Sequence, residues 1–151
     1  MSEAPGRATC LDTSVWVKVW LPEDGSEAAH DLVAGLLERD WVLLAPPTLA
    51  YEVASVLRGK ARRGILSEEA ALAAWAAFQQ VPVRVESAAN LPERAWALAR
   101  RLALPTCYDA AFLAAAGRHP FVTADRVLQE ACRAAPDLRV VDLAQARETL
   151  F

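Results

Sequence analysis

The sequence predicts a three-layer α/β fold, in which a central parallel sheet of about five strands is flanked by helices. Five short apolar, β-branched runs are separated by segments in which apolar residues recur at helical spacing. Strands that alternate with helices need crossover connections, which make the strands parallel and place helices on both faces of the sheet. The length of 151 residues suits one domain, so we expect residues 1–151 to form a single domain.

The predicted strands are short and mostly buried. Their apolar residues run without the alternation of polar side chains that marks a half-exposed sheet, and this pattern is typical of parallel strands that are covered on both faces. The predicted strands are residues 8–11, 41–45, 81–85, 120–123 and 138–143.

Helical patterns fill the segments between these strands. The first helix follows Asp12 and Thr13, which both suit the start of a helix, and it stops before Pro22. The fourth begins at Ser67 with two acids in its first turn, where the helix dipole favours them. We expect region 66–104, which has the weakest strand signal, to form an arm or subdomain packed against the sheet. The predicted helices are residues 13–21, 26–39, 48–63, 67–79, 91–102, 108–116 and 125–134.

Composition limits the classes of protein. The apolar fraction of 54% argues against disorder, and no apolar run approaches the ~20 residues that are needed to cross a bilayer. The first residues contain no signal or lipidation motif, so we expect a cytoplasmic protein with no membrane partner. The three cysteines are odd in number and lack metal-binding spacing, which favours buried free thiols.

Four acidic residues stand at the ends of predicted strands or in the first turns of predicted helices: Asp12, Glu52, Asp109 and Asp125. In an alternating α/β fold, the carboxyl ends of the strands and the starts of the helices share one edge of the sheet, so these side chains can converge. Converging carboxylates need a cation, and oxygen ligands select a hard ion such as Mg²⁺ or Mn²⁺. An ion at this edge would activate a water for attack on a phosphodiester.

Each acid alone also has a structural interpretation. Asp12 and Asp109 suit the caps of helices, and Glu52 on an apolar helix face would form a salt bridge to Arg58 or to another arginine. Separate capping roles explain the whole set of four poorly.

Two hydroxyl residues accompany the acids. Ser14 follows Asp12 by two positions, and Thr123 ends the strand that precedes Asp125. Either hydroxyl would support a carboxylate or a metal-bound water by a hydrogen bond, or would equally cap a backbone group.

The four acids lie in four short motifs. These are Leu11-Asp12-Thr13-Ser14, Pro47-Thr48-Leu49-Ala50-Tyr51-Glu52-Val53, Tyr108-Asp109-Ala110 and Val122-Thr123-Ala124-Asp125. This succession resembles the PIN-domain nucleases, specifically the VapC-type toxins of toxin–antitoxin pairs. The resemblance implies a PIN-like fold and a Mg²⁺- or Mn²⁺-dependent endoribonuclease with an RNA substrate. It also implies a homodimer that is inhibited by a small cognate antitoxin protein, which covers the acidic site.

A basic stretch follows the helix that carries Glu52. Its candidate RNA contacts are Arg58, Lys60, Arg62 and Arg63. The structural interpretation is a solvated helix end, where cations favour the dipole, and the functional one is contact with phosphates beside the acids. The net charge of −3 does not exclude a polyanionic partner, because a bound divalent ion would make the local field more positive.

Two other classes of protein remain open. A phosphatase or receiver-like α/β domain would use Asp12 as a phosphoryl acceptor, but a haloacid-dehalogenase-type site would need an acid where Ser14 stands and a lysine after the later strands. A catalytically silent binding module would use the acids only as helix caps. The tryptophans fall at apolar helical positions, which favours the core or a dimer interface over base stacking.

Overall fold

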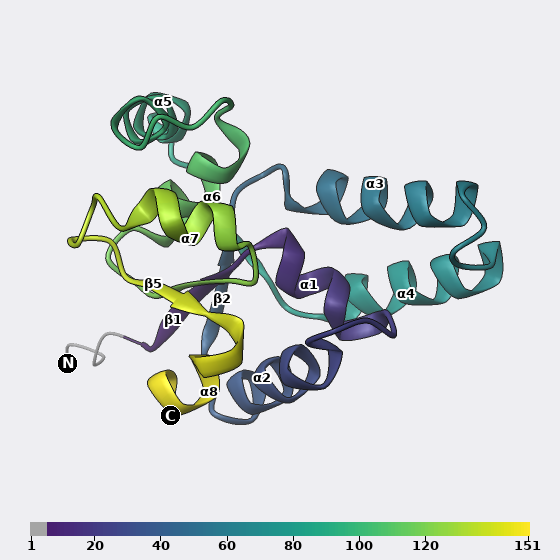
Figure 1. Ribbon diagram of the computed structural model, residues 1–151. Coiled ribbons are helices and arrows are strands. Elements are labelled where there is room, and N and C mark those ends of the chain that lie inside the picture. The colour runs from purple at the N-terminus through teal and green to yellow at the C-terminus, as the bar shows by residue number, and fades with distance from the viewer. Residues whose placement is uncertain (1–5) are drawn as a thin grey trace.

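The computed structural model describes residues 6–151, which form one five-stranded sheet and eight helices (Figure 1). The strands are β1 (Ala8–Leu11), β2 (Val42–Ala45), β3 (Arg84–Val85), β4 (Phe121–Thr123) and β5 (Val140–Asp142). Their order in the sheet is β3-β2-β1-β4-β5, and every neighbouring pair is parallel. The predicted class, a parallel sheet of five strands flanked by helices, is confirmed.

The helices form a layer on each side of the sheet and an arm beside it. One layer contains α1, α2 and α8, which contact one another in that order, and the other contains α5 packed on α6 (Figure 1). Helix α7 packs against β4 and β5. The helices are α1 (Thr13–Trp20), α2 (Ser26–Glu38), α3 (Leu49–Arg62), α4 (Glu68–Gln80), α5 (Leu91–Arg101), α6 (Tyr108–Ala116), α7 (Arg126–Cys132) and α8 (Leu143–Leu150).

The central strands place the end of β1 beside the end of β4. Leu11 pairs with Val122 in the sheet, and both are fully buried. The backbone N–H of Asp12 donates to the Val122 carbonyl at 2.9 Å. Phe112 of α6 and Phe121 of β4 are buried below this point, with ring centroids 6.4 Å apart. The residues that follow the two strands are therefore held next to each other by the core.

Two elements at the edges of the sheet differ from the prediction. Strand β3 contains only Arg84–Val85 of the predicted residues 81–85. Pro82 has no N–H to donate, and β3 is an edge strand, so the pairing with β2 is brief. Helix α8 was not predicted, because the apolar run ending at Leu143 indicated a strand. The signal for α8 was Asp142, whose carboxylate caps the helix by accepting from Ala144 N–H at 3.3 Å.

The arm consists of α3 and α4, which pack together and extend away from the sheet (Figure 1). The prediction of an arm over region 66–104 is therefore correct for α4 and wrong for α5, which lies against α6, and it did not include α3. Phe78 of α4 packs edge-on against Trp16 and Trp20 of α1, with centroids 5.5 and 5.8 Å apart. Lys60 of α3 pairs with Glu23 of the turn between α1 and α2 at 3.4 Å. The aromatic packing fastens the arm to α1, and the ion pair fastens it to the turn that follows α1.

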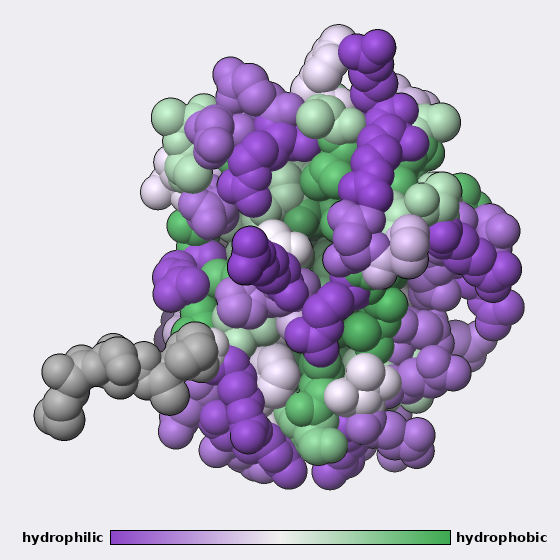
Figure 2. Space-filling view, turned by 90° about the vertical axis from the view of Figure 1, so that its left-hand side faces the viewer, coloured by the Kyte–Doolittle hydropathy of each residue, from purple (hydrophilic) through white to green (hydrophobic). Residues whose placement is uncertain are grey.

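No helix within residues 6–151 combines the length and the apolar character that crossing a bilayer requires. Hydrophilic side chains cover most of the face shown in Figure 2, and hydrophobic ones appear between them. All three cysteines are free thiols; Cys10 and Cys132 are buried, and Cys107 is half-buried.

Candidate functional site

The four acids belong to four different elements that approach one edge of the sheet. Asp12 follows β1, and Asp125 lies just beyond the neighbouring strand β4. Glu52 lies in the first turn of α3, and Asp109 lies in the first turn of α6. Burial is the main cause that raises the pKa of Asp12, Glu52 and Asp109, and neighbouring charges add to it: that of Asp12 acts on Glu52 and Asp109, and that of Asp125 acts on Asp12 and Asp109. Each of the four carboxylates therefore lies within electrostatic reach of at least one other.

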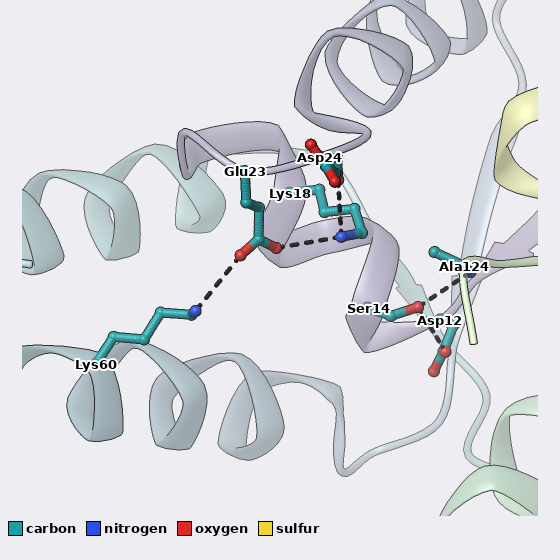
Figure 3. Close-up of polar contacts among 7 residues, drawn as sticks. All are labelled: Asp12, Ser14, Lys18, Glu23, Asp24, Lys60 and Ala124. Carbon is teal, nitrogen blue, oxygen red and sulfur yellow. Dashed lines mark hydrogen bonds and ion pairs between the residues drawn. The ribbon is translucent and has the colours of Figure 1, made fainter. Parts of the chain in front are cut away.

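The Asp12 carboxylate is the most buried of the four, since the residue is 5% exposed. Its Oδ2 atom accepts hydrogen bonds from the hydroxyls of Ser14 and Thr123, each at 2.8 Å (Figure 3 shows the Ser14 contact). Burial raises the pKa of Asp12, and the two hydroxyl donors oppose this shift. The hydrogen bonds fix the orientation of the carboxylate and occupy only one of its oxygens.

Both hydroxyls also accept from the backbone after β4. Ser14 Oγ accepts from Ala124 N–H at 3.2 Å, and Thr123 Oγ1 accepts from Asp125 N–H at 3.0 Å. The two roles that the sequence left open for Ser14 and Thr123, carboxylate support and backbone capping, are thus compatible, because each hydroxyl donates to one group and accepts from another.

Asp125 is the cap of α7. Its Oδ1 atom accepts from the backbone N–H groups of Val127 and Leu128 at 2.9 and 3.1 Å. The other oxygen, Oδ2, forms no hydrogen bond within residues 6–151. Capping therefore uses half of this carboxylate and leaves the second oxygen as a ligand for another group.

Glu52 does not form the salt bridge considered from the sequence, because Arg58 pairs with Glu68 at 3.4 Å. Glu52 Oε2 instead accepts from the Thr48 hydroxyl at 3.0 Å. The sequence analysis missed Thr48, although its position one turn before Glu52 on the same helix face was the signal.

Asp109 forms no side-chain hydrogen bond with any described residue, so the capping role considered for it is not seen. Burial raises its pKa first, followed by the charges of Asp12 and Asp125. Asp109 is thus the carboxylate with the fewest partners.

The site fits a hard divalent cation in the chemistry of its donors. All four side chains offer carboxylate oxygens, and within residues 6–151 none of the four forms an ion pair that offsets its charge. The distances between these side chains fit an ion less well than their chemistry does. Across the described residues, no three Asp, Glu, His or Cys side chains are gathered closely enough to hold one ion. Binding an ion therefore requires these side chains to close around it against their mutual repulsion.

Three of the four basic candidates are engaged by the protein itself. Arg58 pairs with Glu68, Lys60 pairs with Glu23, and Arg63 Nε donates to the Gly59 carbonyl at 3.2 Å. Arg62 forms no ion pair with any residue that the structure describes. These contacts favour a structural role for most of the stretch, in the packing of the arm.

The raised pKa of Asp109 predicts a pH-dependent effect of Asp109→Asn on stability in the presence of a chelator. A carboxyl whose pKa is higher in the folded state favours folding when protonated, and this contribution disappears as the pH rises through the folded-state pKa. At neutral pH the ionised side chain opposes folding, so the variant is expected to be the more stable protein. The difference between the free energies of unfolding of Asp109→Asn and the wild type should become smaller as the pH falls. Urea unfolding over a series of pH values measures it.

Asp137→Asn is the matched control with the opposite sign. Hydrogen bonds from Arg101 lower the pKa of Asp137, so its contribution is present at neutral pH and disappears as the pH falls through the folded-state pKa. This substitution is expected to destabilise the protein at neutral pH and to lose its effect in acid. Parallel pH profiles for the two variants would contradict the electrostatic origin of both effects.

The fold and the site define a class of α/β protein in which carboxylates from four elements lie at the carboxyl edge of a parallel sheet, with oxygen donors of the kind that a hard cation prefers. A model of the PIN domain family matches residues 9–134. The chain belongs to the PIN domain family.

The chain is similar in sequence or structure to proteins from two organisms. Ribonuclease VapC3 of Pyrobaculum aerophilum is 36% identical over 126 residues, which cover 80% of this chain and 91% of that protein. The crystal structure of PAE2754, also from Pyrobaculum aerophilum, matches with a TM-score of 0.68 and 21% identity, over 96% of this chain and 97% of that one. VapBC2 from Rickettsia felis, crystallised with a DNA fragment from its promoter, matches with a TM-score of 0.65 and 11% identity, over 89% and 98%. The two structural matches support the fold.

Proposed function

We propose that this protein is a metal-dependent endoribonuclease and the toxin of a toxin–antitoxin pair. The observation that carries the proposal is that four carboxylates from four elements, none of them ion-paired within residues 6–151, lie at the carboxyl edge of the sheet in a chain of the PIN domain family. The identity of 36% to Ribonuclease VapC3 supports RNA as the substrate.

The cofactor that family membership implies is a divalent metal ion, and the oxygen-only donors favour Mg²⁺ or Mn²⁺. Asp12, Glu52, Asp109 and Asp125 are the residues that would hold it. When bound, the ion supplies polarisation of a phosphate oxygen and acidification of a water.

Other groups of this chain orient the carboxylates of the site. The hydroxyls of Ser14 and Thr123 hold the Asp12 carboxylate in one rotamer, and Thr48 does the same for Glu52. The cap of α7 fixes Asp125 with one oxygen turned away from the helix N–H groups. These contacts lower the cost of ordering the carboxylates around a ligand.

The rival class, in which Asp12 accepts a phosphoryl group, lacks the lysine it needs. The chain has two lysines, Lys18 and Lys60, and both pair with Glu23 at 3.4 Å (Figure 3). Position 14 is a serine that donates to the Asp12 carboxylate. Neither feature suits a phosphoryl-acceptor site. A silent binding module explains poorly why Glu52 and Asp109 cap no helix.

Membership of the PIN domain family also supports a proposal for the partners of this protein. A small cognate antitoxin, a homodimeric state and a cytoplasmic location are parts of the proposed function, as is the use of residues 1–151 as a single PIN domain. The match to a VapBC complex supports the antitoxin. Of the basic stretch, Arg62 is the strongest candidate for contact with RNA, because the other three side chains have partners within the protein.

Circular single-stranded RNA provides a direct test, because only an endonuclease opens it. The purified protein is expected to linearise the circle with Mg²⁺ or Mn²⁺ present, to stop on addition of a chelator, and to resume when excess metal is restored. Mn²⁺ should also raise the melting temperature without RNA, because a ligand of the folded state stabilises that state. Intact circles under every metal condition would overturn the proposed activity.

A further inference from the structure

A basic hollow lies at the edge of the sheet where the strands begin, opposite to the edge that carries the acids. Its volume is about 290 Å³. It is lined by residues that stand one or two positions before four of the strands: Arg7, Trp41, His119 and Arg139. Thr149 of α8 also lines it, and in Figure 1 the end of α8 lies near the start of β1. The parallel sheet therefore gathers basic and aromatic side chains from distant parts of the sequence.

The basic hollow is separate from the acidic site. Arg7 and Asp12 stand at opposite ends of β1, and a rise of ~3.3 Å per residue places them roughly 16 Å apart along the strand. No Asp or Glu of residues 6–151 lines the hollow. A ligand bound in the hollow would therefore not share a metal ion with the four acids.

The two arginines of the hollow have no acidic partner among residues 6–151. Neither Arg7 nor Arg139 forms an ion pair there, and Asp137, two positions before Arg139, pairs with Arg101 instead. Asp40 and Glu148, which adjoin lining residues in the sequence, form no ion pair within the same range. Because like charges that share a hollow repel each other, an anion with about two negative charges would offset both.

Trp41 adds a donor that lacks an acceptor. Phe151 meets its ring edge-on with centroids 6.2 Å apart, and the guanidinium of Arg39 lies over Phe151 at 4.2 Å. The indole Nε1 atom is buried, and no acceptor among the described residues bonds to it. The two other buried side-chain atoms in this state, in Thr13 and Trp16, do not line the hollow. A buried donor without a partner is unfavourable, and an oxygen atom bound against Trp41 would supply the acceptor.

We propose that the basic hollow binds the phosphate monoester of a small molecule, such as a mononucleotide. Near neutral pH this group carries about −1.5 to −2 charges and three acceptor oxygens. The forked guanidiniums of Arg7 and Arg139 suit pairs of phosphate oxygens, and the N–H groups of Trp41 and His119 are further donors. The volume of about 290 Å³ is near the lower end of the range for pockets that enclose a small ligand, so it suits one small molecule and not the face of a folded partner.

Isothermal titration calorimetry in metal-free buffer of constant ionic strength tests the basic hollow without using the acidic site. The probes are inorganic phosphate, AMP and adenosine, which lacks the phosphate group. Inorganic phosphate and AMP are expected to bind one to one, and adenosine at least about 10-fold more weakly than AMP, because hydrogen bonds to a charged group are lost. At a concentration of about ten times its Kd, AMP should raise the melting temperature by about 3–6 °C, since it binds the folded state.

Arg7→Gln and Arg139→Gln should each weaken AMP binding about 10- to 150-fold, because each removes charged donors to the phosphate. Trp41→Phe keeps an aromatic ring beside Phe151 and removes the N–H, so it should weaken AMP binding as well. Arg84→Gln is the matched control, because exposed Arg84 of β3 lies outside the hollow and forms no ion pair within residues 6–151. It removes the same charge and should keep the wild-type affinity.

Equal affinity of AMP for the wild type and for the double variant of Arg7→Gln and Arg139→Gln would overturn the inference. An equal loss of affinity in Arg84→Gln would trace the effect to net charge and would overturn it too. An RNA oligonucleotide with a 5′-hydroxyl group that bound more tightly than AMP, through the same two arginines, would assign the hollow to internucleotide phosphates and reject a small ligand. Each of these outcomes leaves the ribonuclease proposal to its own test on circular RNA.

Discussion

Asp12→Asn is expected to reduce RNA cleavage more than about 100-fold at saturating metal and to leave the fold intact. Changing a group that only orients a metal ligand costs about 10- to 100-fold, so replacing a charged ligand is expected to cost more. The amide keeps the shape of the side chain and still bonds to Ser14 and Thr123, which preserves the junction of β1 and β4. The measurement is the initial rate on circular RNA, with the melting temperature in chelator as the test of folding.

Two further variants make the result specific. Asp142→Asn removes an acid that also ends a strand and caps a helix, but whose carboxylate is bonded to Gln129 and Ala144, so it should retain most of the wild-type rate. Thr123→Val removes one hydroxyl donor to Asp12 and should fall between the two, with a loss of about 10- to 100-fold. Equal rates for Asp12→Asn and the wild type would show that this edge of the sheet is not the site of cleavage.

The central layers of the fold could be predicted from the sequence because their signals are local. The run at β1 and the helix at α6 have the predicted bounds, since each is an apolar segment closed by a strong boundary: Asp12 after β1, and Gly117 after α6. The elements at the edges of the sheet were harder to predict. In β3, Pro82 shortened the strand, and in α8 the buried Leu143 and Ala146 were too few to show a helical period against the preceding β-branched run.

The candidate site could likewise be predicted only in part. Asp12 and Asp125 could be placed from the ends of β1 and β4, because parallel strands finish at one edge. The partner of Glu52 could not, because the choice between Thr48 and Arg58 depends on where Glu68 of the next helix lies. The distances between the carboxylates likewise depend on the tertiary structure. No pattern in the sequence reports how far apart the side chains stand within the described fold.

Trp16→Ala is expected to lower the free energy of unfolding by about 3–5 kcal/mol, which is the usual cost of deleting a large buried aromatic side chain. Trp16 is fully buried in α1, stacks on Trp20 at 6.2 Å and meets Phe78 of the arm edge-on at 5.5 Å. The residual cavity would lie where α1 meets α4, so the arm loses part of its attachment. Urea unfolding followed by far-UV circular dichroism gives the measurement, and the total stability of a domain of this size is about 5–15 kcal/mol.

Trp96→Ala supplies the matched control, because the same atoms are deleted from a side chain that is 68% exposed. Its effect on unfolding should stay within about 0.5 kcal/mol, as for other surface changes. The two tryptophans then separate by burial: deletion of the buried Trp16 ring lowers stability, and deletion of the exposed Trp96 ring does not. If the two substitutions destabilised the protein equally, Trp96 would belong to the packed structure, and burial would not explain the cost of deleting Trp16.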